Sequence, residues 1–111
     1  MEVNKEIKKD SYAVRMTASD NGQEAGRVWL YIIYNDLHKE PYGFLEDVFI
    51  QEEHRGAGLG TKLVQEAIAE AKRIGCYKLI ATTRSSRQAV CAWYEKFGFK
   101  NYGVEFRMDL L

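Results

Sequence analysis

Apolar and polar residues alternate along three stretches in the first half of the chain. These stretches run from Tyr12 to Ala18, from Gly26 to Tyr34 and from Tyr42 to Ile50. A period of two residues is typical of strands with one buried face. Asn21-Gly22 lies between the first two stretches, and this dipeptide is a strong signal for a β-hairpin. The pattern therefore predicts an antiparallel meander.

The second half of the chain changes to a helical period. Seven apolar residues recur on one helical face: Leu59, Leu63, Val64, Ala67, Ile68, Ala71 and Ile74. Gly75 follows them and is a typical helix end. The pattern then predicts a short buried strand over Tyr77 to Thr82 and a second helix over Ser86 to Lys96. It predicts a last strand over Val104 to Leu110. The fold class predicted is α/β (α+β), with a mixed, mostly antiparallel sheet and two main helices.

Length and composition exclude several classes of protein. The 111 residues predict a single domain over residues 1–111. The formal net charge is zero with both signs interspersed, which gives no electrostatic signal for nucleic acid. No apolar run approaches a membrane span, and no apolar signal core begins the chain, so we expect a cytoplasmic protein. Cys76 and Cys91 lack metal spacing, so we expect reduced thiols and no metal.

A glycine-rich turn separates the third strand from the first helix, with Gly56, Gly58 and Gly60 within five residues. Glycine lets a backbone approach a ligand closely, and the first N–H groups of a helix carry partial positive charge. The turn therefore predicts an anion site, most naturally for phosphate. Two known phosphate motifs do not fit. Thr61-Lys62 reverses the order of the nucleoside-triphosphate loop, and no acidic residue ends the next strand as dinucleotide binding requires.

The segment Arg55-Gly56-Ala57-Gly58-Leu59-Gly60 resembles the Arg/Gln-x-x-Gly-x-Gly/Ala motif with which the GNAT family of N-acetyltransferases binds acetyl-CoA. Leu45 to Ile50 is similar to the central strand of that family. Ala92 to Phe99 is similar to its closing Phe-Tyr-x-x-x-Gly-Phe signature, in the same order and spacing. The central strand also resembles the diamine and thialysine acetyltransferase branch. The resemblance extends from Tyr42 to the C-terminus.

The resemblance implies that acetyl-CoA is the cosubstrate. In the family, pantetheine pairs with the central strand beside a bulge, and the pyrophosphate lies on the glycine-rich turn. On this sequence the implied cofactor-binding residues are Val48, Phe49, Ile50, Arg55, Gly56, Ala57, Gly58, Leu59, Gly60, Thr61, Arg87 and Tyr94. Arg55 is a phosphate contact or a clamp on the loop. Either Lys62 or Arg87 could bind the outer phosphate of the nucleotide.

Acyl transfer from a thioester to an amine needs a base, a stabilised oxyanion and an acid for the departing thiolate. By resemblance, Tyr94 is the catalytic acid. Glu46 and Asp47 are the candidate catalytic carboxylates, with Glu46 preferred as the base. Because neighbouring strand residues point to opposite faces, we expect one of the two to reach the cleft. The simpler alternatives are that Tyr94 only packs on its helix and that the carboxylate is paired with a Lys or Arg.

The predicted activity is acetylation of a primary amine on a small molecule (an amine, polyamine or amino-acid-like compound) by direct transfer in a ternary complex. A protein or peptide acceptor and a CoA-binding module without turnover are the alternatives. Only about ten residues precede Tyr12, too few for the strand and two helices with which the family usually begins. We therefore expect an open acceptor pocket or one closed by a second subunit, and predict a homodimer without nucleic-acid or membrane partners. His38 and His54 show no ligand spacing or partner, so we expect surface or loop roles.

Overall fold

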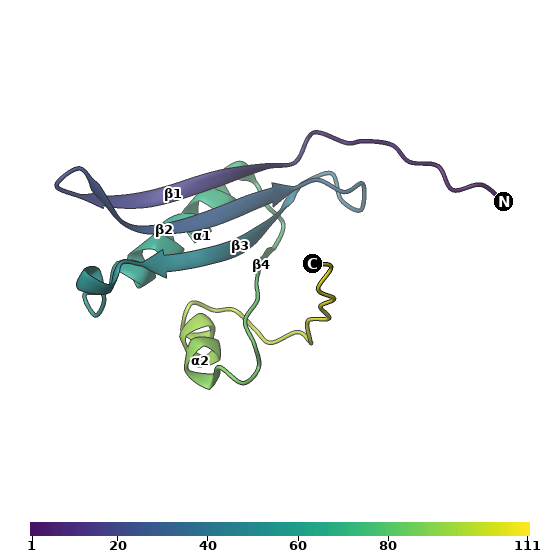
Figure 1. The fold of residues 1–111 in the computed structure, drawn as a ribbon. Helices are drawn as coiled ribbons and strands as arrows, with labels where there is room; N and C mark the ends of the chain where they lie inside the picture. The colour runs from purple at the N-terminus through teal and green to yellow at the C-terminus, as the bar shows by residue number, and fades with distance from the viewer. The chain divides into compact units, whose positions relative to one another are not determined.

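The computed structural model describes residues 1–111, which form two compact units, residues 1–80 and residues 81–111. Figure 1 shows the elements in chain order. They are strands β1 (Tyr12–Asp20), β2 (Gln23–Ile33) and β3 (Tyr42–Ile50), the short 3₁₀ helix η1 (Glu52–His54), helix α1 (Leu59–Ile74), strand β4 (Leu79–Ala81) and helix α2 (Gln88–Lys96).

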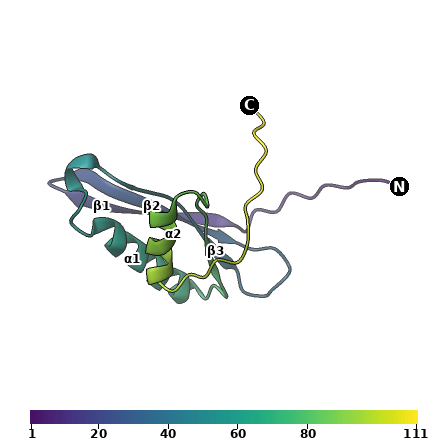
Figure 2. The same ribbon diagram turned by 90° about the horizontal axis from the view of Figure 1, so that it is seen from below.

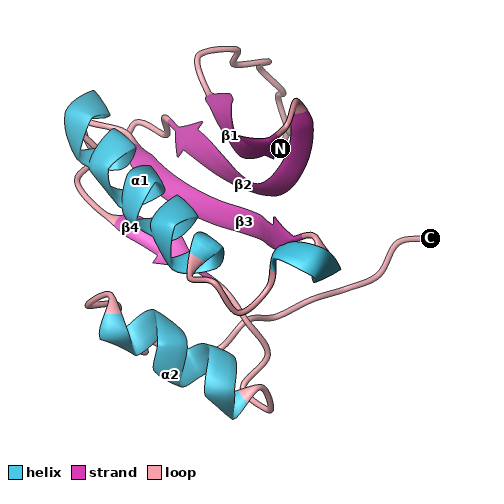
Figure 3. Cartoon of the chain, turned by 90° about the vertical axis from the view of Figure 1, so that its left-hand side faces the viewer, coloured by secondary structure: helices cyan, strands magenta, loops and turns pink.

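The sheet has the strand order β1-β2-β3-β4, and both β1/β2 and β2/β3 are antiparallel. Asn21 and Gly22 form the two-residue hairpin loop with φ of 50° and 78°, as the sequence predicted. The chain then crosses over through α1, and Figure 3 shows β3 and β4 pointing the same way. The predicted meander and the mixed, mostly antiparallel sheet with two helices are confirmed.

Helix α1 covers one face of the β1–β3 sheet, and no helix of the first unit covers the other face (Figure 2). The buried apolar side chains come from β2, β3 and α1: Ala25, Val28, Leu30, Ile32, Leu45, Leu63, Val64, Ala67 and Ala71. Since side chains alternate along a strand, Arg27, Trp29 and Tyr31 of β2 lie on the uncovered face. We call this the open face.

Helix α1 ends at Gly75, as predicted. Gly75 adopts φ of 96°, and its N–H donates to the carbonyl oxygens of Ala71 and Lys72, each at 3.1 Å. A left-handed glycine at this position is a common way to satisfy the last carbonyls of a helix. No helix of the chain has the length and apolar character needed to cross a membrane.

The second unit contains α2 and an irregular C-terminal segment. The strand predicted over Val104–Leu110 is wrong, because residues 100–111 have no regular secondary structure. Apolar alternation shows only that a segment suits a sheet; a strand forms when a neighbouring strand supplies hydrogen bonds. Here Phe106 is 92% exposed. Two other predicted elements are shorter than expected: β4 spans Leu79–Ala81, and α2 begins at Gln88.

We expect Leu30→Ala to lower the free energy of unfolding by about 2–5 kcal/mol, because it removes a fully buried side chain and leaves a cavity. Leu37→Ala is the matched control, since Leu37 is 80% exposed and the same change should cost less than about 0.5 kcal/mol. Urea unfolding followed by circular dichroism measures both. Equal losses in the two variants would contradict this position of the core.

Candidate functional site

Strand β3 carries a β-bulge near its end. Arg27 pairs with Phe49 and Trp29 pairs with Glu46. One residue of β2 therefore lies between these two pairs, whereas two residues of β3 do. Asp47 is one of the two residues in this bulge, and it adopts φ of 55°, a left-handed conformation that is uncommon for residues other than glycine. This confirms the bulge that the family resemblance implied on the central strand.

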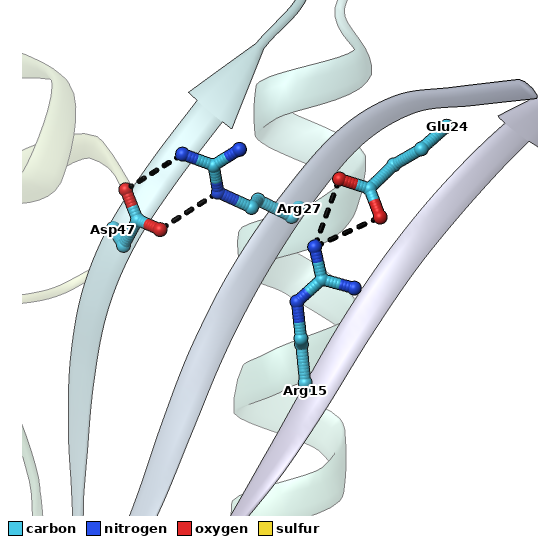
Figure 4. A network of polar contacts seen from close by, with 4 residues as sticks. All are labelled: Arg15, Glu24, Arg27 and Asp47. Atoms are coloured by element: carbon cyan, nitrogen blue, oxygen red, sulfur yellow. Dashed lines mark hydrogen bonds and ion pairs between the residues drawn. The ribbon is translucent and has the colours of Figure 1, made fainter.

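The bulge places Glu46 and Asp47 on the same face of the sheet, so the prediction of opposite faces is wrong. Glu46 is the cross-strand partner of Trp29 on the open face. Asp47 accepts hydrogen bonds from Arg27 of that face, from Nε at 2.7 Å and from Nη2 at 3.3 Å (Figure 4). The physical reason is that one extra residue interrupts the alternation of side chains along β3.

The two carboxylates differ in their surroundings. The hydrogen bonds and charge of Arg27 lower the pKa of Asp47, against a smaller opposing effect of desolvation. Asp47 therefore stays ionised and engaged by a guanidinium. The side chain of Glu46 is exposed and forms neither a hydrogen bond nor an ion pair. It lines a groove on the open face, so Glu46 is the carboxylate that is available to an external group.

Arginine side chains surround Phe49, just past the bulge. The guanidinium of Arg27 lies 4.6 Å from the centroid of the Phe49 ring, and that of Arg55 lies 5.5 Å from it. Arg55 Nε also donates to the carbonyl oxygen of Ile50 at 2.9 Å. Arg55 was expected to be either a phosphate contact or a clamp on the loop. Its hydrogen bond to Ile50 is that of a clamp, because it fastens the glycine-rich turn to the end of β3.

The glycine-rich turn presents the start of α1 without a cap. Gly56 and Gly58 have φ of 85° and 80°, and a Cβ at either would meet no atom within 4 Å. Glycine is favoured here by the left-handed backbone and not by crowding. No side chain caps α1 at Gly58, and its first turn contains no acidic residue. These features suit an anion, because the start of a helix carries partial positive charge.

His54 has a partner that the sequence alone does not reveal. Its Nε2 lies 3.0 Å from Asp20 Oδ2, which connects η1 to the end of β1. The two residues are 34 positions apart, and no local pattern signals such a contact. Both line a cavity of about 430 Å³ that also includes Gly58 and Lys62. His38 also has a neighbour, since its ring stacks on Tyr77 at 3.8 Å.

Tyr94 belongs to an aromatic cluster in the second unit. Its ring centroid lies 5.2 Å from that of Trp93 and 5.5 Å from that of Phe99. Burial raises the pKa of the Tyr94 phenol, opposed by the nearby charge of Arg87, the residue before α2. The phenol therefore keeps its proton at neutral pH, which leaves it able to donate that proton. Packing in the cluster and proton donation are compatible roles for this side chain.

The sequence and structure are similar to known acetyltransferases. The model of the Acetyltransferase (GNAT) family matches residues 2–99. Glucosamine 6-phosphate N-acetyltransferase of Trypanosoma brucei brucei is 37% identical over 68 residues, which are 61% of this chain and 44% of that protein. N-alpha-acetyltransferase 30 of Schizosaccharomyces pombe is 31% identical over 95 residues, which are 84% of this chain and 61% of that protein.

Solved structures agree with this match. Glucosamine-6-phosphate N-acetyltransferase from Arabidopsis thaliana superposes with a TM-score of 0.78 at 26% identity, over 88% of this chain and 67% of that one. An acetyltransferase from Trypanosoma brucei gives a TM-score of 0.78 at 29% identity, over 88% and 69%. The chain spans 44% and 61% of the length of the two sequence relatives described above.

We expect Arg27→Met to raise the pKa of Asp47 toward its ordinary value of about 3.9. A carbon-detected NMR titration of the side-chain carboxyls measures it. Because folding lowers this pKa, the pair stabilises the fold above the unfolded-state pKa, and that contribution is lost as the pH falls through the folded-state value. Arg15→Met is the control, since Arg15 pairs with Glu24 and adds only the smallest effect on Asp47. An equal rise in both variants would contradict the assignment.

Proposed function

Because the chain belongs to the GNAT family of acetyltransferases, we propose that it transfers an acetyl group from acetyl-CoA to a primary amine of a small molecule. The observation that carries the proposal is the uncapped start of α1 and its two left-handed glycines, directly after the bulged strand β3. This arrangement offers a phosphate site next to the bulged end of β3, where Asp47 and Val48 lie opposite the single residue Val28 of β2. Acetyl-CoA needs both, one for its pyrophosphate and one for its pantetheine arm.

In this proposal the glycine-rich turn holds the pyrophosphate. The N–H groups around Gly58 and Gly60 point their partial positive charge at the phosphate oxygens. Arg55 keeps the turn in position through its hydrogen bond to Ile50. Phe49 and Ile50 already pair with Arg27 and Gly26 of β2, so the pantetheine arm pairs with the backbone of residues 48–50 along the other edge of β3. Lys62 and Arg87 both remain candidates for the outer phosphate; Lys62 lines the same cavity as Gly58.

The chemical step then has one residue for the proton of the ammonium and one for the departing thiolate. An alkylammonium has a pKa of about 10, so the amine must lose a proton before it attacks. Glu46 attracts the ammonium and takes that proton, directly or through a water. The amine nitrogen bonds to the thioester carbon, backbone N–H groups of the bulged strand stabilise the oxyanion, and the C–S bond breaks. Tyr94 gives its proton to the departing sulfur and is reprotonated from solvent, and the attacking nitrogen releases its second proton to solvent as the amide forms. Transfer is direct, without an acetyl-enzyme.

Asp47 has a supporting role in this scheme. Its carboxylate is held by Arg27 and its pKa is lowered, so it is not assigned as the base. The ion pair instead holds Asp47 in its left-handed conformation, and with it the bulge.

The second candidate acceptor is an α-amino group. It is favoured by the relative from Schizosaccharomyces pombe, which is named N-alpha-acetyltransferase 30 and aligns over 84% of this chain. Release of free CoA thiol in the presence of small amines or of short peptides with free N-termini distinguishes the two acceptor classes.

We expect Gly58→Glu to weaken acetyl-CoA binding at least about tenfold, which is about 1.4 kcal/mol, because it places a negative charge and bulk against the pyrophosphate. Gly75→Glu is the matched control. Gly75 has the same left-handed backbone and open surroundings, but it lies at the other end of α1. Isothermal titration calorimetry of acetyl-CoA into both folded variants measures the effect. Wild-type affinity in Gly58→Glu would refute the phosphate site.

We expect Tyr94→Phe to lower kcat by about 10²–10⁴-fold, because the change removes the proton donor and keeps the ring in its aromatic cluster. Acetyl-CoA affinity should stay at the wild-type value. Tyr102→Phe is the control, since Tyr102 is 94% exposed in the C-terminal segment and should show unchanged turnover. A kcat close to that of the wild type would leave Tyr94 with a packing role alone.

A further inference from the structure

We propose that the groove on the open face of the sheet is the acceptor site, and that it takes a primary amine with an apolar body and no phosphate. This inference rests on the proposed function and names the class of its substrate. It depends on three features of the groove, which are its walls, its charge and its position relative to the bulge.

The walls of the groove are apolar and aromatic. Its volume is about 480 Å³, and its lining residues on the open face include Ala13, Tyr31, Ile33 and Phe44. Sites for small organic molecules have volumes of about 300–1,000 Å³ and similar walls. The ring of Tyr31 also stacks on that of Trp29, with centroids 5.9 Å apart and planes inclined by 16°. This surface suits a flat or aliphatic body better than a polyhydroxylated ring.

The groove has one uncompensated charge. Glu46 is the only charged residue among those that line it, and it forms no ion pair. The neighbouring charges of the open face neutralise one another in two pairs, Arg27 with Asp47 and Arg15 with Glu24 (Figure 4). A single free carboxylate complements an ammonium group. A phosphate would need Arg or Lys partners, and none lines the groove.

The position of Glu46 gives the ligand its direction. Glu46 is the last residue of β3 before the bulge, and Phe44 lies two residues further from the bulge on the same face. An ammonium at Glu46 would therefore lie beside the backbone to which we assign the acetyl arm. The apolar body would extend away from the bulge, along Phe44 and Tyr31 toward the start of β1. This order of charge and apolar surface matches a primary amine with an apolar tail.

This class differs from the acceptor named for two of the similar proteins, which are glucosamine 6-phosphate N-acetyltransferases. The difference provides the test. The full chain is assayed for acetyl-CoA consumption with 2-phenylethylamine, glucosamine and glucosamine 6-phosphate. We expect kcat/KM for 2-phenylethylamine to exceed that for glucosamine 6-phosphate at least about tenfold, because an apolar wall and a free carboxylate both disfavour a phosphate.

Phe44→Arg is the decisive variant, since it places a cation in the wall of the groove. It should lower kcat/KM for 2-phenylethylamine, raise it for glucosamine 6-phosphate, and leave acetyl-CoA affinity unchanged. Leu37→Ala, an exposed loop change outside the groove, should match the wild type on every substrate. Glu46→Gln should weaken the binding of 2-phenylethylamine itself, measured by calorimetry in the presence of CoA.

The outcomes separate this inference from the proposed function. Two outcomes would overturn the groove assignment without refuting the acetyltransferase activity. One is a wild-type kcat/KM for glucosamine 6-phosphate that equals or exceeds that for 2-phenylethylamine. The other is a substrate preference that Phe44→Arg does not change. If 2-phenylethylamine binds the wild type but not Phe44→Arg, and no amine consumes acetyl-CoA, the groove assignment is supported and the proposed function is refuted. Failure of 2-phenylethylamine to bind because a second copy of the chain covers the groove would also overturn the inference.

Discussion

One extra residue in β3 determines the geometry of the candidate site. In a regular strand Glu46 and Asp47 would face opposite sides of the sheet, and every residue after them would keep its pairing with β2. The bulge instead brings both carboxylates to the open face and shifts the register between Trp29 and Arg27. The left-handed conformation of Asp47 is uncommon outside glycine, although Asp tolerates it better than most residues. The bidentate contact with Arg27 favours that conformation in the folded state.

The two faces of the sheet have different tasks. One face packs its aliphatic residues against α1, and the core of the first unit lies there. The other face keeps aromatic rings and charges exposed, and its two arginine–carboxylate pairs leave Glu46 as the unpaired charge of the groove. The residues that stabilise the first unit and the residues of the candidate acceptor groove therefore lie on opposite faces of the sheet. Exposed ion pairs contribute little to stability, so their main effect here is to position side chains.

The parts of the fold that were predictable are those encoded by neighbouring residues. Asn21-Gly22 predicted the hairpin because few other residue pairs tolerate its backbone. The apolar face of α1 and its end at Gly75 followed from the helical period and a left-handed C-terminal residue. By contrast, Val104–Leu110 has the alternation of a strand but not the structure. Hydrogen-bond partners for a strand come from distant parts of the chain and leave no mark in the segment itself.

The sequence by itself determined the order of the elements, the left-handed turn before α1 and, through its motifs, the family. Each depends on residues close together in the chain, whose backbone preferences act locally. Only the tertiary structure decided which carboxylate is occupied and which is free, because Arg27 and Asp47 are 20 residues apart and meet through the register of two strands. The same holds for His54 and Asp20, and for the groove, whose residues come from three strands. A register shift of one residue reverses side-chain direction, and that shift is a property of the paired strands together.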